Sequence, residues 1–319
     1  MSIMLAVQSK TIAPTPVEAV KQLTHEGWWF ELKWDGVRCL ASREEDGTIT
    51  LINRRGDDIT ERFPDVAEVL ATHGPDGSWI LDGEVVVFGA GGKPDFNLLA
   101  KRKVTSASKA RALADAIPAY FVAFDVLAFD EHQYRDAPYV SRRMVLEEEV
   151  HTQDRLVVSS ATQDGAALWD FVLEQELEGI VAKRPFAPWV PNRSDAWVKF
   201  RRTNTVSCVP FAYEPGTGWA EDLVGALRLG LLDPDDPDEL IDVGKVGTGF
   251  TKADRKELLK HFRKGGDCLS IEEIVVEVEY QELTPDGKLR FPSFKGVRTD
   301  QTAEDCTFDQ ITHTGGGKS

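Results

Sequence analysis

Residues 29–41 have the sequence WFELKWDGVRCLA, in which two apolar and aromatic runs flank the dipeptide Asp35-Gly36. An Asp-Gly pair between such runs is a strong signal for a two-residue β-hairpin. That hairpin would place Lys33 opposite Arg38 and point both, with Glu31, to one face. Two opposed cations favour an anion, most simply a phosphate, between them. Because Lys-x-Asp-Gly also arises by chance, this functional interpretation depends on the chemistry around it.

Short apolar runs rich in β-branched or aromatic residues predict further strands. They lie at residues 79–88, 119–129, 179–184 and 196–201. Helices are predicted at residues 61–72, 165–178 and 252–264. Asp164 is the expected N-cap of the second helix, and Gly179 and Gly265 are the expected C-terminal stops of the second and third. Together these elements predict the α+β fold class.

The length of 319 residues is enough for two domains with separate cores. Beyond the basic run that ends near Thr203-Asn204-Thr205, short strands are broken by Gly and Pro. We therefore place the first domain at residues 1–202 and the second at residues 206–319. Strand-like runs with one intervening helix predict that the second is a small closed β-barrel. These runs are residues 225–232, 242–246 and 274–280.

Composition excludes several classes of protein. The four cysteines lie far apart without a Cys-x-x-Cys pair, so the sequence indicates neither a zinc site nor a disulfide framework. No stretch approaches about 20 uninterrupted apolar residues, and the N-terminus lacks the basic start and apolar core of a signal peptide. We therefore expect a cytoplasmic protein without a membrane segment.

The charge balance is acidic, with 37 basic and 53 acidic residues and a net charge of −16. This total argues against a protein that coats nucleic acid through bulk charge. Binding depends on the local field, however, and residues 183–202 carry six basic side chains against Asp195 alone. A solvated charged face is the alternative interpretation of such a cluster.

Three carboxylates lie in or beside apolar strands, where an unpaired charge is costly to desolvate. They are Glu84, Asp125 and Glu178. Each either forms a structural ion pair or cap, or binds a metal ion, and the residues alone leave both interpretations open.

The run Trp197-Val198-Lys199-Phe200-Arg201-Arg202 places Lys199 and Arg201 on one face of a strand, about 6.6 Å apart. That face would clamp an anion. The alternative is an exposed pair of charges on an edge strand.

Taken in order, these runs resemble the nucleotidyltransferase motifs of ATP-dependent DNA ligases, and the resemblance extends through almost the whole chain. Residues 31–38 resemble motif I, whose lysine takes AMP, which implies that Lys33 is the catalytic nucleophile. Residues 53–56 resemble the next motif and imply that Arg54 contacts a phosphate. Phe124 falls where the family stacks an aromatic ring on adenine.

The resemblance also covers the acidic and basic strands. Residues 82–84 resemble motif III and imply that Glu84 serves the sugar or a metal ion. Residues 178–183 resemble motif IV, whose glutamate, here Glu178, supports the metal. The residues that the resemblance further assigns to the nucleotide and its phosphates are Glu31, Arg38, Lys183, Lys199 and Arg201. Arg201 stands where a second lysine is usual in motif V, which preserves the charge.

The second domain resembles the oligonucleotide-binding (OB) fold of bacterial ligases related to the ligase module of ligase D and its stand-alone relatives. Residues 225–230 and 243–250 carry this resemblance. Residues 290–300 are similar to motif VI, which acts on ATP and implies a nucleotide contact by Arg298. Gln301 stands where this motif has lysine, which puts that one contact in question.

The resemblance implies a nucleotidyltransferase (adenylation) domain of antiparallel sheets with helices, followed by a β-barrel OB-fold domain. It implies an ATP-dependent DNA ligase that seals 3′-hydroxyl/5′-phosphate nicks or breaks through lysyl-AMP and DNA-adenylate. ATP would be the co-substrate, Mg²⁺ or Mn²⁺ the metal, and nicked or broken double-stranded DNA the partner of a monomeric protein. Repair, recombination and replication stay open as its role.

Two other functions compete with this interpretation. An RNA ligase or RNA-capping nucleotidyltransferase is separated from it by the nucleotide and the polynucleotide used. A noncatalytic nucleic-acid-binding protein built on an OB fold belongs to a different class. The intact motif around Lys33 argues against the second alternative, and a mass increase of one AMP separates the two.

Overall fold

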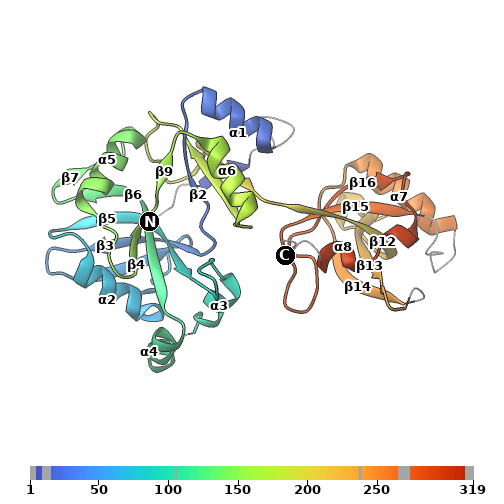
Figure 1. Ribbon diagram of the computed structural model, residues 1–319, viewed down its shortest axis with the longest axis horizontal. Helices are drawn as coiled ribbons and strands as arrows, with labels where there is room; N and C mark the ends of the chain where they lie inside the picture. Colours follow the sequence, from blue (N-terminus) through green and yellow to red (C-terminus); the bar gives the residue numbers. More distant parts are fainter. Residues whose placement is uncertain (1–4, 9–15, 105, 237–238, 265–273, 313–319) are drawn as a thin grey trace. The chain divides into compact units, whose positions relative to one another are not determined.

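The computed structural model describes residues 5–8, 16–104, 106–236, 239–264 and 274–312. The chain divides into two compact units, unit 1 at residues 1–202 and unit 2 at residues 203–319 (Figure 1). Both units combine antiparallel sheets with helices, which confirms the predicted α+β class. Among the described residues, no helix is long and apolar enough to cross a membrane.

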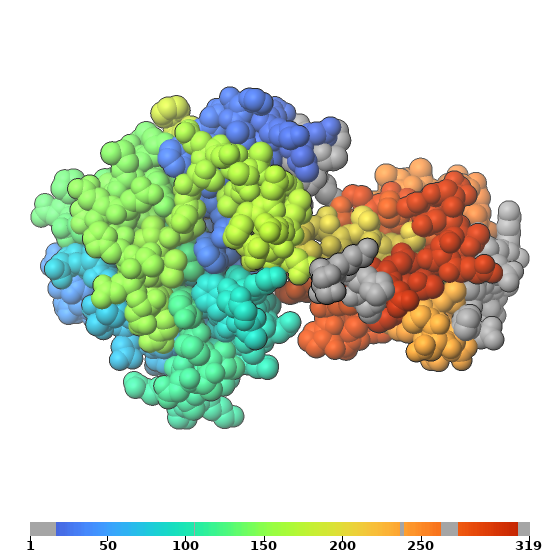
Figure 2. Space-filling view, in the orientation of Figure 1, coloured from blue at the N-terminus to red at the C-terminus, as the bar shows by residue number. Residues whose placement is uncertain are grey.

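The first sheet of unit 1 has five strands in the order β1-β11-β10-β2-β9. Its neighbours pair antiparallel, except that β1 is parallel to β11. Helices α1 and α6 lie side by side (Figure 2), and both pack on one face of this sheet. The bounds are β1 Leu5–Gln8, β2 Trp29–Leu32, β9 Ala161–Thr162, β10 Gly179–Lys183, β11 Arg193–Arg201, α1 Pro16–His25 and α6 Gly165–Glu174.

Period-two alternation divides the side chains of this sheet between its two faces. Ile180, Ala182, Val198 and Phe200 pack into the core beneath α1 and α6. The alternate residues of β10 and β11 face a cavity on the other side. Apolar strands can therefore carry functional side chains on one face while the other face builds the core.

The second sheet of unit 1 has the order β4-β3-β5-β6-β7, and β8 pairs parallel with β6. Helix α2 packs on this sheet through Val66, Val69 and Leu70. The strands are β3 Val37–Arg43, β4 Ile49–Asn53, β5 Trp79–Val87, β6 Ala119–Phe129, β7 His132–Gln133 and β8 Leu156–Val158. The helices are η2 Thr60–Arg62, α2 Pro64–His73, α3 Phe96–Lys101, α4 Ala107–Ala116 and α5 Tyr139–Glu149.

The hairpin predicted at Asp35-Gly36 is wrong. β2 and β3 belong to different sheets, and the chain crosses between the sheets at these two residues. A type I′ turn needs positive φ at both central residues, and neither residue has it. Instead, Lys33 N–H donates to Gly179 O at 2.9 Å and prolongs the β2–β10 ladder. Glycine is required at position 36 because a Cβ there would lie 2.3 Å from Val85 O.

Helix α6 begins as predicted but ends earlier. Asp164 caps it by accepting a hydrogen bond from Ala167 N–H at 3.0 Å. The helix has ended before Glu176, which has a left-handed φ of 53°. Gly179 is therefore not the helix stop, which corrects the prediction. It is the first residue of β10, and a Cβ there would lie 1.9 Å from Phe200 O.

Unit 2 has one five-stranded sheet in the order β14-β13-β12-β15-β16 and is the predicted OB fold. Leu289 N–H donates to Val243 O, and Phe294 N–H donates to Thr248 O, both at 2.9 Å, so the two edges of the curled sheet are joined. The strands are β12 Asn204–Pro215, β13 Val224–Leu232, β14 Leu240–Val246, β15 Val275–Tyr280 and β16 Ser293–Arg298. The helices are η3 Gly218–Ala220, α7 Lys252–Lys264, η4 Ala303–Asp305 and α8 Asp309–Thr312.

Two further helix predictions can be compared with the structure. α7 has the predicted bounds, and Gly265, its expected stop, lies outside the described residues. α2 begins at Pro64 rather than at residue 61, because a 3₁₀ turn precedes it and proline suits the first turn of a helix.

Candidate active site

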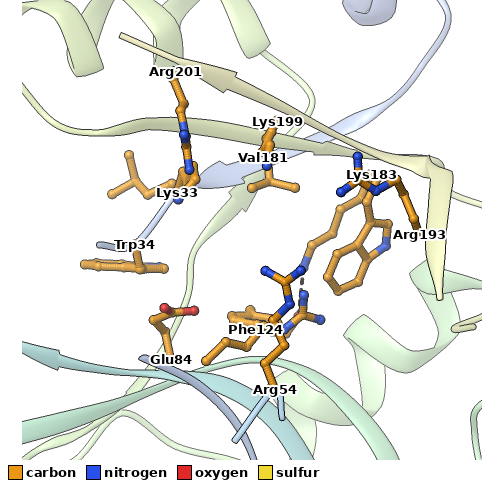
Figure 3. A pocket seen from close by; sticks show the side chains of 13 residues that line it. Lys33, Trp34, Arg54, Glu84, Phe124, Val181, Lys183, Arg193, Lys199 and Arg201 are labelled. Carbon is orange, nitrogen blue, oxygen red and sulfur yellow. Dashed lines mark hydrogen bonds between the residues drawn. The ribbon is translucent and has the colours of Figure 1, made fainter. Parts of the chain in front are cut away.

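A cavity of about 220 Å³ lies between the two sheets of unit 1. One wall comes from the first sheet and the segment after β2, and the other comes from β3, β5, β6 and the loop after β4. Figure 3 shows that charged side chains from both walls converge on this space. Eight residues singled out from the sequence line it: Lys33, Arg38, Arg54, Glu84, Phe124, Lys183, Lys199 and Arg201.

Lys33 extends from the end of β2 into the cavity. Its Nζ donates a hydrogen bond to Glu178 Oε2 at 2.5 Å. The other oxygen of Glu178 lies 3.5 Å from Arg201 Nε. Glu178 does not itself line the cavity; it lies behind two of the cations that do. The carboxylate thus holds the amine and the guanidinium on the same wall.

Four of the cations on this wall lie close enough together to repel one another. Lys33 comes from the first sheet, and Arg193, Lys199 and Arg201 share one face of β11. Burial, together with the charges of Arg201, Lys33 and Arg193, lowers the pKa of Lys199 to about 8. Such crowding of positive charge is unfavourable without an anion, so the wall is suited to bind phosphate groups.

Glu84 projects into the cavity from β5 and faces Trp34 (Figure 3). Burial raises the pKa of Glu84 to about 8, and the nearby charges of Lys33 and Arg38 oppose that rise. Among the described residues, no side chain forms a hydrogen bond or ion pair with this carboxyl group. A half-buried carboxyl without such a partner is available to a cation that enters the cavity.

Arg38 is held in place from behind by a buried carboxylate. Its Nε and Nη2 donate to Asp82 at 2.9 and 2.6 Å, and Trp189 Nε1 donates to the same carboxylate at 2.9 Å. The guanidinium lies 5.1 Å from the ring centroid of Phe124 and 5.0 Å from that of Trp197. Asp82 and Trp189 therefore orient a cation whose outer face lines the cavity.

Glu31 does not line the cavity, although the resemblance assigns it to the nucleotide. It is buried, and it accepts hydrogen bonds from Lys183 Nζ and from Tyr139 Oη, the latter at 2.6 Å. Lys183 Nζ also donates to Phe124 O at 3.1 Å and lies 4.4 Å from the centroid of Trp197. Glu31 therefore anchors Lys183, which in turn supports the aromatic end of the cavity.

Phe124 presents its ring to this end of the cavity and lies edge-on to Trp197, with centroids 6.0 Å apart. The next residue, Asp125, points away and forms a fully buried bidentate pair with Arg142, with both distances at 2.8 Å. Of the two interpretations left open for Asp125, the structure shows the structural ion pair.

A second cavity, of about 830 Å³, adjoins the first. Arg38, Arg54 and Glu84 line both cavities. The second cavity adds three cations of its own, Arg55, Arg62 and Lys103.

Arg298 lies in unit 2, at the end of β16, and not among the residues that line either cavity. Its guanidinium donates to both oxygens of Asp300 at 2.8 and 2.7 Å, and to Glu277 at 3.3 Å. The hydrogen bond from Arg298 lowers the pKa of Asp300 to about 2.

Sequence reasoning missed Arg193, Trp34, Tyr139 and Trp189. Arg193 could have been found from the sequence. It lies an even number of positions from Lys199 and Arg201, so it shares their face of the strand once the strand is extended back to residue 193. The other three had no comparable signal, because aromatic residues are usual in a core. Within the described part of the chain, no group of three or more His, Cys, Asp or Glu side chains could hold a metal ion.

Two family models match the chain. The model of the ATP dependent DNA ligase domain matches residues 3–201, and that of the ATP dependent DNA ligase C terminal region matches residues 220–301. The first covers unit 1 almost completely, and the second lies within unit 2.

Curated relatives share about three residues in ten with the chain. It is 31% identical over 303 residues to the multifunctional non-homologous end joining protein LigD of Mycolicibacterium smegmatis, which covers 88% of this chain and 37% of that protein. It is 30% identical over 303 residues to a DNA ligase of Thermococcus fumicolans, which covers 89% of this chain and 54% of that protein. The chain thus spans between a third and just over a half of these relatives.

Solved structures agree with these matches. The mycobacterial DNA ligase D complexed with ATP and MES gives a TM-score of 0.52 at 27% identity, over 96% of this chain and 98% of that one. A Lig E DNA ligase gives a TM-score of 0.61 at 20% identity, and the match covers 93% of this chain and 99% of that one. This match shows a likeness of fold.

Proposed function

Since the chain belongs to the family of ATP-dependent DNA ligases, we propose that it seals 3′-hydroxyl/5′-phosphate nicks or breaks through a lysyl-AMP intermediate. The observation that supports this best is the position of Lys33. Its amine enters a cavity with Lys199 and Arg201 on the same wall and an aromatic ring, Phe124, on the opposite wall. This arrangement suits a phosphate beside the amine and a base beside the ring.

The first step joins Lys33 to AMP. Lys33 Nζ attacks the α-phosphorus of ATP, a P–N bond forms, and the P–O bond to pyrophosphate breaks. The amine must lose a proton, and Glu178 Oε2, at 2.5 Å, is the acceptor already in contact with it. Lys199 and Arg201 stabilise the negative charge that develops on the phosphate oxygens.

The later steps use the same cations. The 5′-phosphate of a broken strand attacks the lysyl-AMP, which returns the lysine and leaves AMP on the strand. The neighbouring 3′-hydroxyl then attacks that 5′-phosphorus and expels AMP. Arg54 borders both cavities, so it can contact a phosphate that passes from one to the other.

The residues present also suit a divalent cation. Mg²⁺ is usually bound through one or two carboxylates together with substrate phosphates. Glu84, which has no partner among the described residues, and Glu178 would hold it. When bound, Mg²⁺ or Mn²⁺ would neutralise negative charge on the phosphate groups.

The polynucleotide is proposed to be nicked or broken double-stranded DNA. The cations of the second cavity would contact backbone phosphates, which are the same in every sequence. We also propose that the protein acts as a monomer, because one chain supplies all the groups used above, and that it acts in the cytoplasm, as its sequence predicts.

The test incubates the protein with ATP and Mg²⁺ and then adds nicked DNA, nicked RNA or a hybrid. Intact-mass measurement should show an increase of one AMP on wild type and none on Lys33→Ala. Lys109→Ala, on the exposed face of α4, is the matched control and should behave as wild type. Adduct with closure only of RNA would favour the RNA-joining alternative, and AMP on another lysine would contradict the assignment of Lys33.

A further inference from the structure

Gln301 follows directly on the Arg298–Asp300 pair, and its side chain has a partner within unit 2. Ser207 Oγ donates a hydrogen bond to Gln301 Oε1. Ser207 lies on β12 and is buried, with only 5% of its surface exposed. Motif VI of the ligase family usually has lysine at this position. A lysine side chain has no hydrogen-bond acceptor, so it could not accept this hydrogen bond from Ser207 Oγ.

The segment after Gln301 is fastened to the same point of β12. Gln310 Oε1 accepts from Ser207 N–H at 3.3 Å, and Gln310 Nε2 donates to Ser207 O at 3.4 Å and to Asp305 O at 2.8 Å. Between them, Thr302 and Asp305 form a reciprocal capping box at η4. Ser207 therefore holds both ends of the segment 301–310.

The β15–β16 ladder and Glu277 hold Arg298 from one side, and Asp300, at the start of this segment, holds its guanidinium from the other. The β15–β16 ladder ends at Arg298, so strand pairing does not fix Asp300. Asp300 nevertheless holds the guanidinium through two hydrogen bonds. The covalent neighbour of Asp300 is Gln301, and the contact with Ser207 is the first tertiary side-chain anchor after β16 among the described residues.

We infer that Gln301 is a positioning residue, which through Ser207 fixes the bend after β16 that carries Asp300, the carboxylate that holds Arg298. This inference rests on the proposed function, because it places Gln301 in the adenylation step by way of Arg298. Arg298 supplies the cation of this motif, and Gln301 supplies its anchor. A lysine at position 301 adds a charge but removes the anchor, so it slows adenylation.

A double-mutant cycle tests the inference. The variants are Ser207→Ala, Gln301→Lys and the double variant, with Gln301→Glu retaining the acceptor. Thr205→Ala, which removes an exposed hydroxyl from the same strand, is the matched control. Two single-turnover rates are measured: formation of lysyl-AMP from ATP, and closure of a nick that already carries AMP.

Ser207→Ala and Gln301→Lys should each lower the rate of lysyl-AMP formation by about 3- to 10-fold, the range of one hydrogen bond. Closure of the pre-adenylated nick should stay within about 2-fold of wild type, because that step expels no pyrophosphate. The double variant should lose no more than the slower single variant, since both remove the same hydrogen bond. Gln301→Glu should keep most of the rate, and the control should match wild type.

Faster adenylation by Gln301→Lys, additive losses in the double variant, or equal loss of both rates would each overturn the inference. Thermal unfolding is followed for every variant. If Ser207→Ala does not fold, Ser207→Cys, which keeps the volume but donates weakly, takes its place. Failure of the proposed function would give a different result, because the wild-type protein itself would then form no lysyl-AMP.

Discussion

Lys33 Nζ and Glu178 Oε2 lie 2.5 Å apart, although 145 positions of sequence separate the two residues. Neighbouring antiparallel strands bring them together, because β2 leads into Lys33 and β10 begins directly after Glu178. The expected nucleophile is therefore held as an ammonium group in an ion pair. It must lose both the proton and the contact before it can attack.

Glu178→Gln keeps the shape of the side chain and removes its charge. We expect lysyl-AMP formation to slow by about 100-fold or more, because the variant loses both a proton acceptor and a metal ligand. Single-turnover formation of the adduct at several Mg²⁺ concentrations measures this. Glu174→Gln, on the exposed side of α6, is the control. A normal rate with normal Mg²⁺ dependence would mean that Glu178 is structural.

Glu84→Gln should change how stability depends on pH in metal-free protein. The folded pKa of Glu84, about 8, is above its ordinary value of 4.5, so ionisation costs stability as pH rises from about 4.5 through 8. Glutamine does not ionise. The Tm of the variant should match wild type near pH 5 and exceed it increasingly toward pH 9, as measured in EDTA by calorimetry. A constant difference across this range would show that the carboxyl is already ionised at pH 5.

Gly36→Ala should destabilise unit 1 and impair adenylation. The new Cβ would lie 2.3 Å from Val85 O and 2.7 Å from Glu84 Cγ, so the crossing between the sheets must shift. We expect a loss of about 1–3 kcal/mol in the free energy of unfolding, as for other overpacked sites. Denaturant titration measures it. Gly296→Ala has no atom within 4 Å of its Cβ and should change stability little. Equal stability of the two variants would contradict the close approach.

Arg298→Ala should separate two steps of the reaction. Loss of the cation should slow lysyl-AMP formation, in which pyrophosphate leaves, and spare closure of a nick that already carries AMP. Both rates are measured by quenched flow with matched substrates. Lys295→Ala, which removes another cation of β16, is the control. Equal loss of both steps, with an unchanged circular dichroism spectrum, would count against a role confined to adenylation.

Local patterns in the sequence predicted the strands and their facing residues well. Alternation alone placed Lys199 and Arg201 on one face of a strand, and both line the cavity. The apolar, β-branched and aromatic run at residues 119–129 likewise predicted β6 with its observed bounds. These features depend on neighbours within a few residues, where backbone geometry is nearly invariant.

Two predictions that depended on glycine were wrong. Gly36 suggested a turn and Gly179 a helix stop, because both are the usual reasons for glycine. In the structure each glycine is instead required where the backbone passes close to a distant strand. Such a contact depends on residues far away in sequence, so no local pattern reports it.

The sequence also did not predict which residues pair with the charged side chains of the site. Glu31 was expected to face the nucleotide, yet it lies under Lys183, 152 positions away. Asp82 and Trp189, which orient Arg38, are 107 positions apart. Which carboxylate meets which cation is decided by which strands pair and in what register, as for Glu31 with Lys183 and Arg38 with Asp82, and not by the period of any one strand.

Arg38, Arg54 and Glu84 belong to the lining of both cavities of unit 1. Whatever neutralises these charges from one side changes the potential felt on the other, so the two cavities have a coupling free energy. Thermodynamic reciprocity then applies: if a bound nucleotide changes the affinity for a polynucleotide by some factor, the polynucleotide changes the affinity for the nucleotide by the same factor. Occupancy of one cavity should therefore be measurable as a change in affinity at the other.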